Sequence, residues 1–370
     1  MSGSKIQVAV VFGGRNDEHE VSCGSAASIL GHLDRRRYDV VPVKIGIDGS
    51  WIVGIDDPDL FTADEHRARS FLINDFTRVH GKGEQALSSI LRALEQIQGT
   101  DVIFPALHGP YGEDGTLQSM LEMCGIPFVG NGVLASAVGM DKEYTKKLLA
   151  ASGLSVADGI VLRHERESLS AEQKQRLGLP VFVKPARSGS SVGVSRVDTW
   201  ETLPAAIAAA TESDRKVLVE AALTGREIDV GVLELPDGSV EVSPPLEIRL
   251  ASHQRLFDHE AKYTDAGATF EVPADLDPEI TERLRDLSRR AFAALECTGL
   301  LRVDFFVDDN GAATVNEVNT FPGFTSSSQY PRMWQAVGLD YTDLLNTLIE
   351  TALRRTEQRT AGELVASPDR

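Results

Sequence analysis

Carboxylates, amides and an arginine are concentrated in one short stretch of the chain, residues 302–323, with the sequence RVDFFVDDNGAATVNEVNTFPG. Two β-like runs in this stretch flank the dipeptide Asn310-Gly311. Asn-Gly is a strong signal for a two-residue hairpin turn, because both central residues of that turn need a positive φ angle. The stretch is therefore predicted to form a β-hairpin.

The register of this hairpin would bring four polar side chains together. With Asn-Gly as the turn, Asp304 lies opposite Glu317, and Arg302 lies opposite Asn319. Residues two apart in a strand share a face, so all four side chains are predicted to project the same way. Two carboxylates and an amide are hard oxygen ligands suited to Mg²⁺. An arginine beside them can stabilise negative charge that forms next to the metal.

The alternative interpretation is a solvated hairpin whose polar side chains simply face water. The remaining positions of the strands argue against it, because they include Phe305, Val307, Val318 and Phe321 and so indicate burial. Buried carboxylates need a metal or another cation. We therefore predict a divalent-metal site on this hairpin.

A second stretch offers groups that bind phosphate. Residues 184–195, KPARSGSSVGVS, form a Gly/Ser-rich loop after a buried-looking strand. Such a loop presents backbone N–H groups and hydroxyls to phosphate oxygens. Lys184 at the end of that strand and Lys142 in the first turn of a helix add positive charge. Either lysine alone is more simply interpreted as a surface side chain.

Two common nucleotide motifs are missing from the sequence. It contains no G-x-x-x-x-G-K-[ST] phosphate loop and no G-x-G-x-x-G after the first strand, and the latter counts against a dinucleotide dehydrogenase. The segment 220–227, EAALTGRE, could pass along an adenine ring with Glu227 near the ribose. From the residues alone it is equally a plain linker.

The elements that must position these groups alternate between strands and helices. Apolar runs near residues 6–12, 40–46 and 101–107 alternate with helical patterns, which predicts a parallel sheet covered by helices. We expect an α/β protein, α+β overall. The predicted units are residues 1–130, 131–220 and 221–361, with a frayed tail at 362–370.

Finer predictions concern the second and third units. Asp141 is expected to cap a helix that stops at Gly153. Strands are predicted at 181–186 and 216–221, and in the third unit at 226–235 and 239–248. A helix follows at 279–297, and a final amphipathic helix carries Leu344 to Leu353 on one face.

Composition narrows the class of partner. The net charge of −18 has no basic stripe to offset it, so nucleic acid and anionic membranes are not expected to bind. The three cysteines lie far apart without a C-x-x-C pair, which favours reduced thiols and a cytoplasmic location. The N-terminal apolar run is too short for a signal peptide.

Taken together, the motifs resemble those of the D-alanine–D-alanine ligases of the ATP-grasp superfamily. The matching segments occur in the family's order and span most of the chain: GGRNDEHEVS (13–22), HGPYGEDGTLQ (108–118), MDK (140–142), KPARSGSSVGVS, EAKY (260–263), RVD (302–304) and NEVNTFPGFTSSS (316–328). The resemblance implies an ATP-grasp fold of three domains, the first a Rossmann-like parallel sheet. It also implies that ATP is held between the other two.

The resemblance also implies roles for individual residues. Those that touch the reacting groups are expected to be Glu18, Ser190, Tyr263, Arg302 and Gly323. The expected ATP-binding residues are Lys142, Lys184, Ser191, Glu220, Ala221, Leu223, Glu227 and Lys262. Further substrate contacts are expected from His108 and Ser328, and the expected metal ligands are Asp304, Glu317 and Asn319.

The implied reaction uses ATP with Mg²⁺ or Mn²⁺, with two ions, to join two D-alanines through an acyl phosphate. The product serves cell-wall precursors, and a homodimer is expected. His259 stands where the family often has an aromatic residue, which leaves open a related ligase for D-lactate, D-serine or a specialised dipeptide. Two other classes of protein agree with parts of the sequence: an NAD-linked oxidoreductase and a non-catalytic nucleotide sensor.

Overall fold

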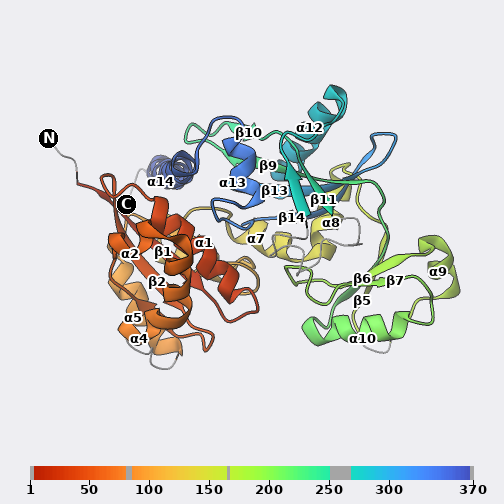
Figure 1. Cartoon of the computed structure of the whole chain (residues 1–370), viewed down its shortest axis with the longest axis horizontal. Coiled ribbons are helices and arrows are strands. Elements are labelled where there is room, and N and C mark those ends of the chain that lie inside the picture. The colour runs from red at the N-terminus through yellow and green to blue at the C-terminus, as the bar shows by residue number, and fades with distance from the viewer. Residues whose placement is uncertain (1–3, 81–85, 165–166, 251–267, 367–370) are drawn as a thin grey trace.

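A computed structural model of the chain describes residues 4–80, 86–164, 167–250 and 268–366. Three β-sheets follow one another along the sequence and form three units (Figure 1). The N-terminal unit lies at one end of the molecule and the central sheet at the other. The third sheet and helices α7 and α8 lie between them, so residues far apart in the sequence meet there.

The N-terminal sheet has the strand order β3-β2-β1-β4, in which β1 runs parallel to both of its neighbours. The apolar run of β1 is almost wholly buried, as expected for a parallel strand covered on both faces. This confirms the predicted Rossmann-like sheet. Its strands are β1 (Ile6–Gly13), β2 (Tyr38–Ile45), β3 (Trp51–Val53) and β4 (Val102–Ala106).

Helices pack around this sheet. The connection at residues 48–88, which showed no clear pattern in the sequence, contains strand β3 and several short helices. The helices of the unit are α1 (His19–His32), α2 (Pro58–Ala63), α3 (Glu65–Ser70), the π-helix η1 (Phe71–Asp75), α4 (Phe76–His80), α5 (Ala86–Ile97) and α6 (Thr116–Cys124).

The central unit is a four-stranded antiparallel sheet with the order β5-β8-β6-β7. Its elements are β5 (Gly159–Leu162), α9 (Ala171–Leu177), β6 (Val181–Pro185), β7 (Ser195–Val197), α10 (Leu203–Ser213) and β8 (Val217–Ala221). Helices α7 (Val133–Met140) and α8 (Lys142–Ala151) precede it. The side chain of Asp141 accepts hydrogen bonds from the N–H groups of Glu143 and Tyr144, so the predicted cap of α8 is confirmed.

The third sheet has the order β12-β11-β9-β13-β14, and β10 pairs with β9. The single strand predicted at 239–248 is wrong, because Pro244-Pro245 separates two strands and proline cannot donate to a ladder. The elements are β9 (Arg226–Glu234), β10 (Val240–Val242), β11 (Leu246–Leu250), β12 (Ala268–Glu271), α12 (Pro278–Ala294), β13 (Leu300–Val307), β14 (Ala313–Asn319) and α13 (Gln329–Gln335).

The β13–β14 hairpin has the predicted register at the site but a different turn. Asp308 and Ala312 close a three-residue loop, in which Gly311 has a φ of +76° and Asn310 does not have a positive φ. The turn shifts the pairing by one residue, so Phe305 lies opposite Val315. A bulge between Asp304 and Phe305 then restores the predicted pairing closer to the site.

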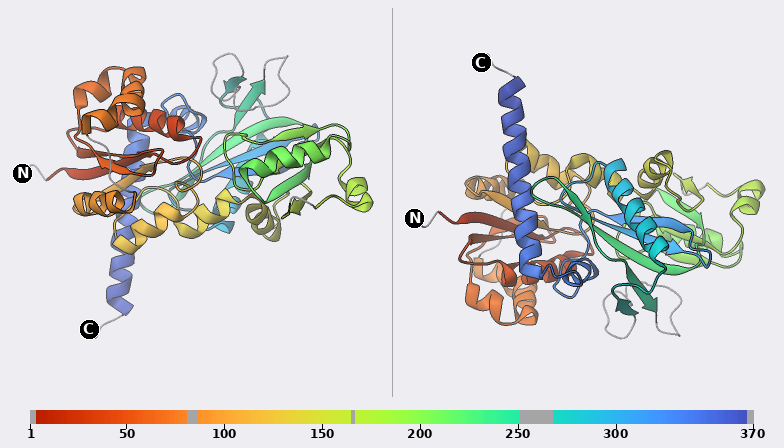
Figure 2. Two further views of the ribbon diagram at one scale, coloured as in Figure 1. Left: turned by 90° about the horizontal axis from the view of Figure 1, so that it is seen from below. Right: turned by 90° about the horizontal axis from the view of Figure 1, so that it is seen from above.

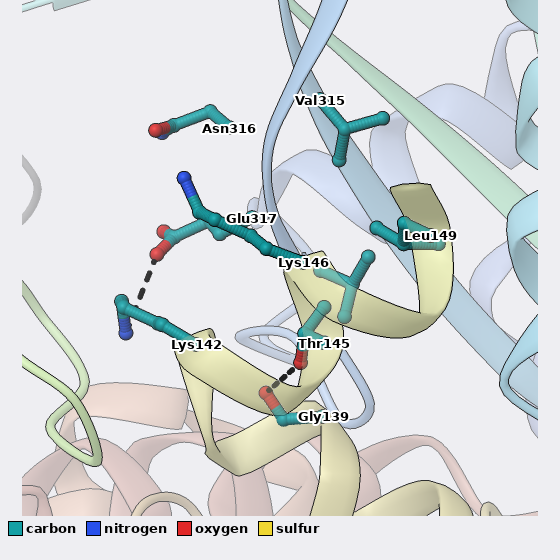
Figure 3. A pocket seen from close by; sticks show the side chains of 9 residues that line it. Gly139, Lys142, Thr145, Lys146, Leu149, Val315, Asn316 and Glu317 are labelled. Carbon is teal, nitrogen blue, oxygen red and sulfur yellow. Dashed lines mark hydrogen bonds and ion pairs between the residues drawn. The ribbon is translucent and has the colours of Figure 1, made fainter. Parts of the chain in front are cut away.

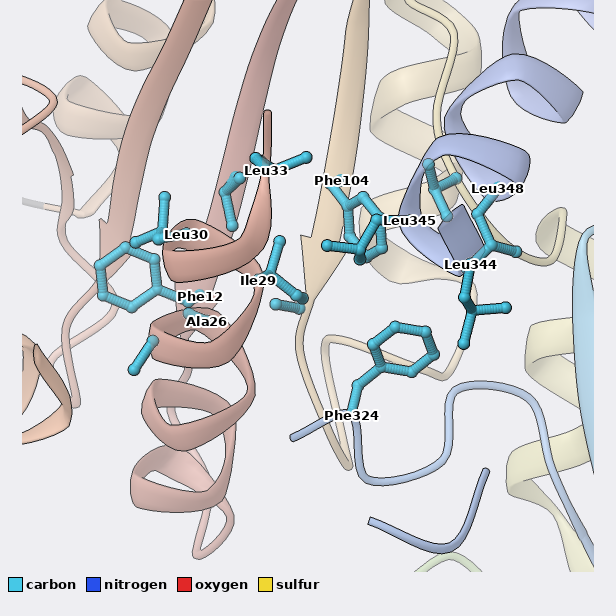
Figure 4. Packing of buried hydrophobic residues seen from close by; sticks show 14 of the residues in the cluster. Phe12, Ala26, Ile29, Leu30, Leu33, Phe104, Phe324, Leu344, Leu345 and Leu348 are labelled. Carbon is cyan, nitrogen blue, oxygen red and sulfur yellow. The ribbon is translucent and has the colours of Figure 1, made fainter. Parts of the chain in front are cut away.

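Helix α14 (Tyr341–Ala366) returns to the N-terminal unit. Figure 2 shows it crossing that unit and extending beyond it at its C-terminal end. Leu344, Leu345 and Leu348 are buried in one core with Phe12 and Phe104 of the first sheet (Figure 4). The helix also continues through residues 362–366 of the predicted tail. The domain boundaries drawn from the sequence stay a prediction, although α14 packs with the first sheet.

Within the described residues, no helix is both long and apolar enough to span a membrane.

We predict that Leu345→Ala lowers the free energy of unfolding by roughly 2–5 kcal/mol, the usual cost of emptying a buried leucine site. Leu345 is 0% exposed, whereas Leu91 on α5 is 55% exposed and provides the matched control. Urea unfolding monitored by circular dichroism measures both variants. A change of less than about 0.5 kcal/mol for Leu345→Ala, the range of an ordinary surface substitution, would show that α14 does not contribute to this core.

Candidate active site

Three carboxylates lie in a row across three adjacent strands of the third sheet. Asp229 on β9 lies opposite Asp304 on β13, and Asp304 lies opposite Glu317 on β14. Directly opposite side chains in a sheet have Cβ atoms about 4.5–5.5 Å apart, so the charges of this row repel one another. The row therefore needs positive charge close by.

Arg302 supplies that charge from within the sheet. Its Nε and Nη2 donate to the two oxygens of Asp304 at 2.7 and 2.6 Å, and its Nε lies 3.3 Å from Asp229 Oδ2. Burial alone would lower the pKa of Arg302, but Asp304 and Asp229 raise it overall. Burial, followed by the charge of Asp304, raises the pKa of Asp229 well above its ordinary value.

The donor set fits a divalent cation. The amide nitrogen of Asn319 donates to Asp304 Oδ2 at 2.9 Å, which brings the amide against the two carboxylates of Asp304 and Glu317. In the described part of the chain no three His, Cys, Asp or Glu side chains form a metal-binding group by themselves. Mg²⁺ commonly binds to one or two carboxylates and completes its shell with waters and substrate phosphates, which agrees with this smaller set.

Positive charge faces the row from helix α8 and the central sheet. Lys142 Nζ lies 3.6 Å from a Glu317 oxygen (Figure 3). It also donates to the carbonyl oxygen of Ser188 at 2.9 Å. This ammonium therefore joins the β13–β14 hairpin, the start of α8 and the Gly/Ser-rich loop. A pocket beside it is lined by Gly139, Lys142, Thr145, Lys146, Leu149, Val315, Asn316, Glu317 and Val318.

One buried carboxylate holds two further lysines. Glu220 is 3% exposed, and its oxygens lie 2.7 Å from Lys146 Nζ and 2.6 Å from Lys184 Nζ. Burial, followed by the charge of Lys184, lowers the pKa of Lys146 to about 8. Burial would raise the pKa of Glu220, but the two lysines lower it overall. An anionic ligand could bind the ammonium group of one lysine, and the other lysine would still neutralise the charge of Glu220.

The start of α1 contacts the Gly/Ser-rich loop. Glu18, immediately before α1, is 9% exposed and accepts a hydrogen bond from Ser190 Oγ. Gly189 permits this close approach, because a Cβ there would lie 2.6 Å from Glu18 Oε2. Ser190 and Ser191 have φ angles of +50° and +60°, which non-glycine residues rarely adopt. The loop is thus held in an unusual conformation against the N-terminal unit.

His108 is buried near the same end of the site. Its Nε2 lies 2.8 Å from Ser25 Oγ and its Nδ1 lies 3.2 Å from the Phe321 carbonyl oxygen. Burial lowers the pKa of His108 overall, although the charge of Glu18 acts in the opposite direction. Glu113 accepts from the N–H groups of Gly109 and Phe321 at 2.7 and 3.0 Å.

Two sequence profiles match the chain. The one described as D-ala D-ala ligase N-terminus matches residues 7–131, and the one described as D-ala D-ala ligase C-terminus matches residues 148–350. The chain belongs to the D-alanine–D-alanine ligase family.

Curated relatives in this family are similar over nearly their whole length. The D-alanine–D-alanine ligase of Mycobacterium bovis is 52% identical over 360 residues, which cover 95% of this chain and 96% of that protein. The D-alanine–D-alanine ligase of Nocardia farcinica is 53% identical over 358 residues, with 95% and 98% covered.

Solved structures of ligases share the architecture. The D-alanine-D-alanine ligase of Coxiella burnetii superimposes with a TM-score of 0.79 at 32% identity and covers 98% of this chain and 97% of its own. The VanG D-Ala:D-Ser ligase of Enterococcus faecalis gives a TM-score of 0.78 at 33% identity, with 94% and 100% covered. The expected ATP-grasp fold is thereby confirmed.

The structure of this ligase-family chain brings together many of the residues singled out in the sequence. These residues are those of the β13–β14 hairpin, Lys142, Lys184 beside Glu220, and the pair Glu18–Ser190, and they line connected parts of one region. Gly323 lies beside Ser328, whose Oγ accepts from the N–H of Thr325 at 3.0 Å. Lys262 and Tyr263, like His259, lie outside the described residues.

The residues expected near the nucleotide run from the end of β8 through the connector into β9 of the third sheet. Ala221 donates its N–H to the Asp158 carbonyl oxygen at 2.9 Å, and Leu223 follows it in the connector. Glu227 lies on β9 opposite Phe306 of β13. The connector therefore joins the two units beside Glu220, but the roles of its residues toward a nucleotide stay predictions.

Four site residues were not singled out from the sequence: Asp229, Lys146, Glu113 and Gln329. A signal existed for two of them. Lys146 is four residues after Lys142 and so shares its helix face. Asp229 interrupts an apolar strand, where a carboxylate needs a partner. Glu113 lies within a recognised motif but has no pattern of its own, and Gln329 is an ordinary helix start.

A pH-dependent stability is predicted for Glu113. Burial, followed by the charge of Glu18, raises its pKa from 4.5 to about 8. Between these values the folded state binds more protons than the unfolded state, so this group's contribution to stability falls as pH rises.

Relative to Glu113→Gln, the wild type should lose up to about 1.4 kcal/mol of unfolding free energy per pH unit between about pH 5 and pH 7.5. Urea unfolding of both proteins across this range measures the difference. Parallel pH curves would show that Glu113 ionises at an ordinary pH in the folded protein.

Proposed function

We propose that this protein uses ATP to join two D-alanines into D-alanyl-D-alanine, with release of ADP and phosphate. The observation that carries the proposal is the position of the Lys142 ammonium between Glu317 of the β13–β14 hairpin and Ser188 of the Gly/Ser-rich loop. A ligand that brings a metal ion and phosphate together would bind where these elements meet. Membership of the ligase family supplies the class of substrate.

The first half of the proposed reaction activates a carboxylate. Glu18 accepts the ammonium of the first D-alanine, while Lys142 and Lys184 bind phosphate oxygens of ATP. The substrate carboxylate then attacks the γ-phosphorus, the bond to the β–γ bridging oxygen breaks, and ADP leaves. The acyl phosphate formed has the leaving group that a free carboxylate lacks.

The second half forms the amide bond. The amine of the second D-alanine attacks the acyl carbon, and the carbonyl oxygen gains negative charge before phosphate leaves and the amine loses a proton. Arg302 and the N–H of Gly323 are the proposed donors to that oxygen. His108 orients the first substrate, and Ser328 contacts the carboxylate of the second.

Asp304, Glu317 and Asn319 are the residues proposed to hold Mg²⁺ or Mn²⁺, with two ions in all. When bound, the cation offsets the charge that phosphate oxygens carry during transfer. The other ATP-binding residues are proposed to be Ser191, Glu220, Ala221, Leu223 and Glu227, with Lys262 from the segment outside the described residues. Tyr263 of that segment is proposed to act with Glu18 and Ser190 beside the reacting groups. A homodimer and a cytoplasmic location also stay predictions.

A substrate panel tests the proposed reaction. The protein is incubated with ATP, Mg²⁺ and D-alanine alone, then with D-serine or D-lactate added, and products are identified by mass. We expect D-alanyl-D-alanine as the main product and one phosphate released per dipeptide, with L-alanine as the inactive control. Absence of phosphate release with D-alanine alone contradicts the proposal, and a dominant mixed product assigns a different second substrate.

The proposed metal ligand Glu317 on the β13–β14 hairpin can be tested by substitution. Glu317→Gln should reduce Mg²⁺-dependent turnover by about 100-fold or more while the protein stays folded, because a cation supplies several kcal/mol of charge stabilisation. Steady-state phosphate release at ordinary Mg²⁺ measures this, and Glu241→Gln on the exposed edge of β10 is the matched control. Near-normal turnover of Glu317→Gln would exclude this carboxylate as a ligand.

A further inference from the structure

Asp229 is the most deeply buried carboxylate of the site, and the proposed reaction gives it no role. It is 0% exposed on β9, directly opposite Asp304. Its Oδ2 accepts from Gln329 Nε2 at 3.0 Å and lies 3.3 Å from Arg302 Nε. Its Oδ1 is buried and has no hydrogen-bond partner among the described residues. The Asp229 carboxyl is also in side-chain hydrogen-bonding contact with Asp304, so the two carboxyl groups lie against each other as well as against Arg302.

Arg302 has two sets of partners that compete for it. Its shortest hydrogen bonds go to both oxygens of Asp304, and its Nη1 donates to Gln329 Oε1 at 3.2 Å. A cation on Asp304 would compete with the guanidinium for the same two oxygens and would repel it. Asp229 and Gln329 already contact the guanidinium and can then retain it.

Gln329 is chemically suited to couple these groups. Its carbonyl oxygen accepts from Arg302 while its amide nitrogen donates to Asp229. An apolar side chain of similar length would make neither bond, and a carboxylate could not donate to Asp229. Gln329 is also the first residue of α13, directly after Ser328, so its backbone position is set by the start of that helix.

We propose that Asp229, together with Gln329, is a positioning residue that retains the Arg302 guanidinium when a divalent cation takes Asp304. This inference rests on the proposed function, because it requires the metal site on the hairpin. The partner exchange keeps Arg302 beside the site as a donor to the developing oxyanion, and it leaves Asp304 free for the cation. Without the pair Asp229–Gln329, which we call the brace, the guanidinium has Asp304 as its main partner and competes with the metal.

The test measures Mn²⁺ binding to the protein saturated with ADP, from the electron paramagnetic resonance signal of the free ion. ADP with Mn²⁺ but without protein gives the background. Asp229→Asn and Gln329→Met should each weaken Mn²⁺ binding about tenfold, in the range found for residues that support metal ligands. Asp237→Asn, in the exposed turn after β9, is the matched control.

Gln329→Met separates a brace from a simple effect of charge, because it removes both hydrogen bonds without changing the net charge. A pure charge effect predicts weaker Mn²⁺ binding for Asp229→Asn alone. The brace predicts weaker binding for both, and a double variant close to the weaker single variant, because both act through Arg302. Kinetically, kcat should fall about tenfold in each while KM for ATP changes less than about twofold.

The outcomes distinguish this inference from the proposed function. If the wild type binds no more Mn²⁺ than ADP alone, the metal site itself fails. If the wild type binds Mn²⁺ and Gln329→Met matches it in Mn²⁺ affinity and kcat, the brace is overturned. Additive effects in the double variant would also overturn it. Gln329 is half-buried at a helix start, so its variant remains informative if Asp229→Asn does not fold.

Discussion

The repulsion among Asp229, Asp304 and Glu317, placed side by side on three neighbouring strands, is the constraint on which the site depends. Carboxylates directly opposite one another destabilise a sheet, and burial strengthens the effect. Compensation comes from Arg302 within the sheet and from Lys142 on α8. The third sheet and α8 are therefore tied electrostatically as well as by packing, and this joins the two walls of the site.

On the opposite side of the site, in the central unit and α8, the charges have the reverse arrangement. There one carboxylate, Glu220, lies between Lys146 and Lys184, whereas Arg302 lies between Asp229 and Asp304. When a ligand binds one of the two partners, Glu220 or Arg302 therefore still has the other partner of opposite charge. Removing a partner from a buried ion pair costs roughly 3–5 kcal/mol, so an exchange of partners makes binding far less costly than the exposure of a bare charge.

The sequence predicts the parallel N-terminal sheet, the capped start of α8 and the pairing of Asp304 with Glu317, because each depends on local signals. The predicted turn type was wrong, because Asn-Gly is compatible with both a two-residue and a three-residue loop. The bulge after Asp304 compensates for the longer loop, so the same residues pair at the site in either case. Asp229 could not be placed, because no local pattern states which strand becomes the neighbour of β13. The return of α14 to the first sheet is a packing choice that its amphipathic pattern leaves open.

That return has a consequence for the order in which the chain acquires its structure. Domains generally fold as units during synthesis, the N-terminal one first. Here the core around Phe12 and Phe104 includes Leu344, Leu345 and Leu348 near the far end of the chain. A nascent N-terminal sheet therefore leaves the ribosome with an unfilled apolar face, which stays open until α14 has been translated and packs against it.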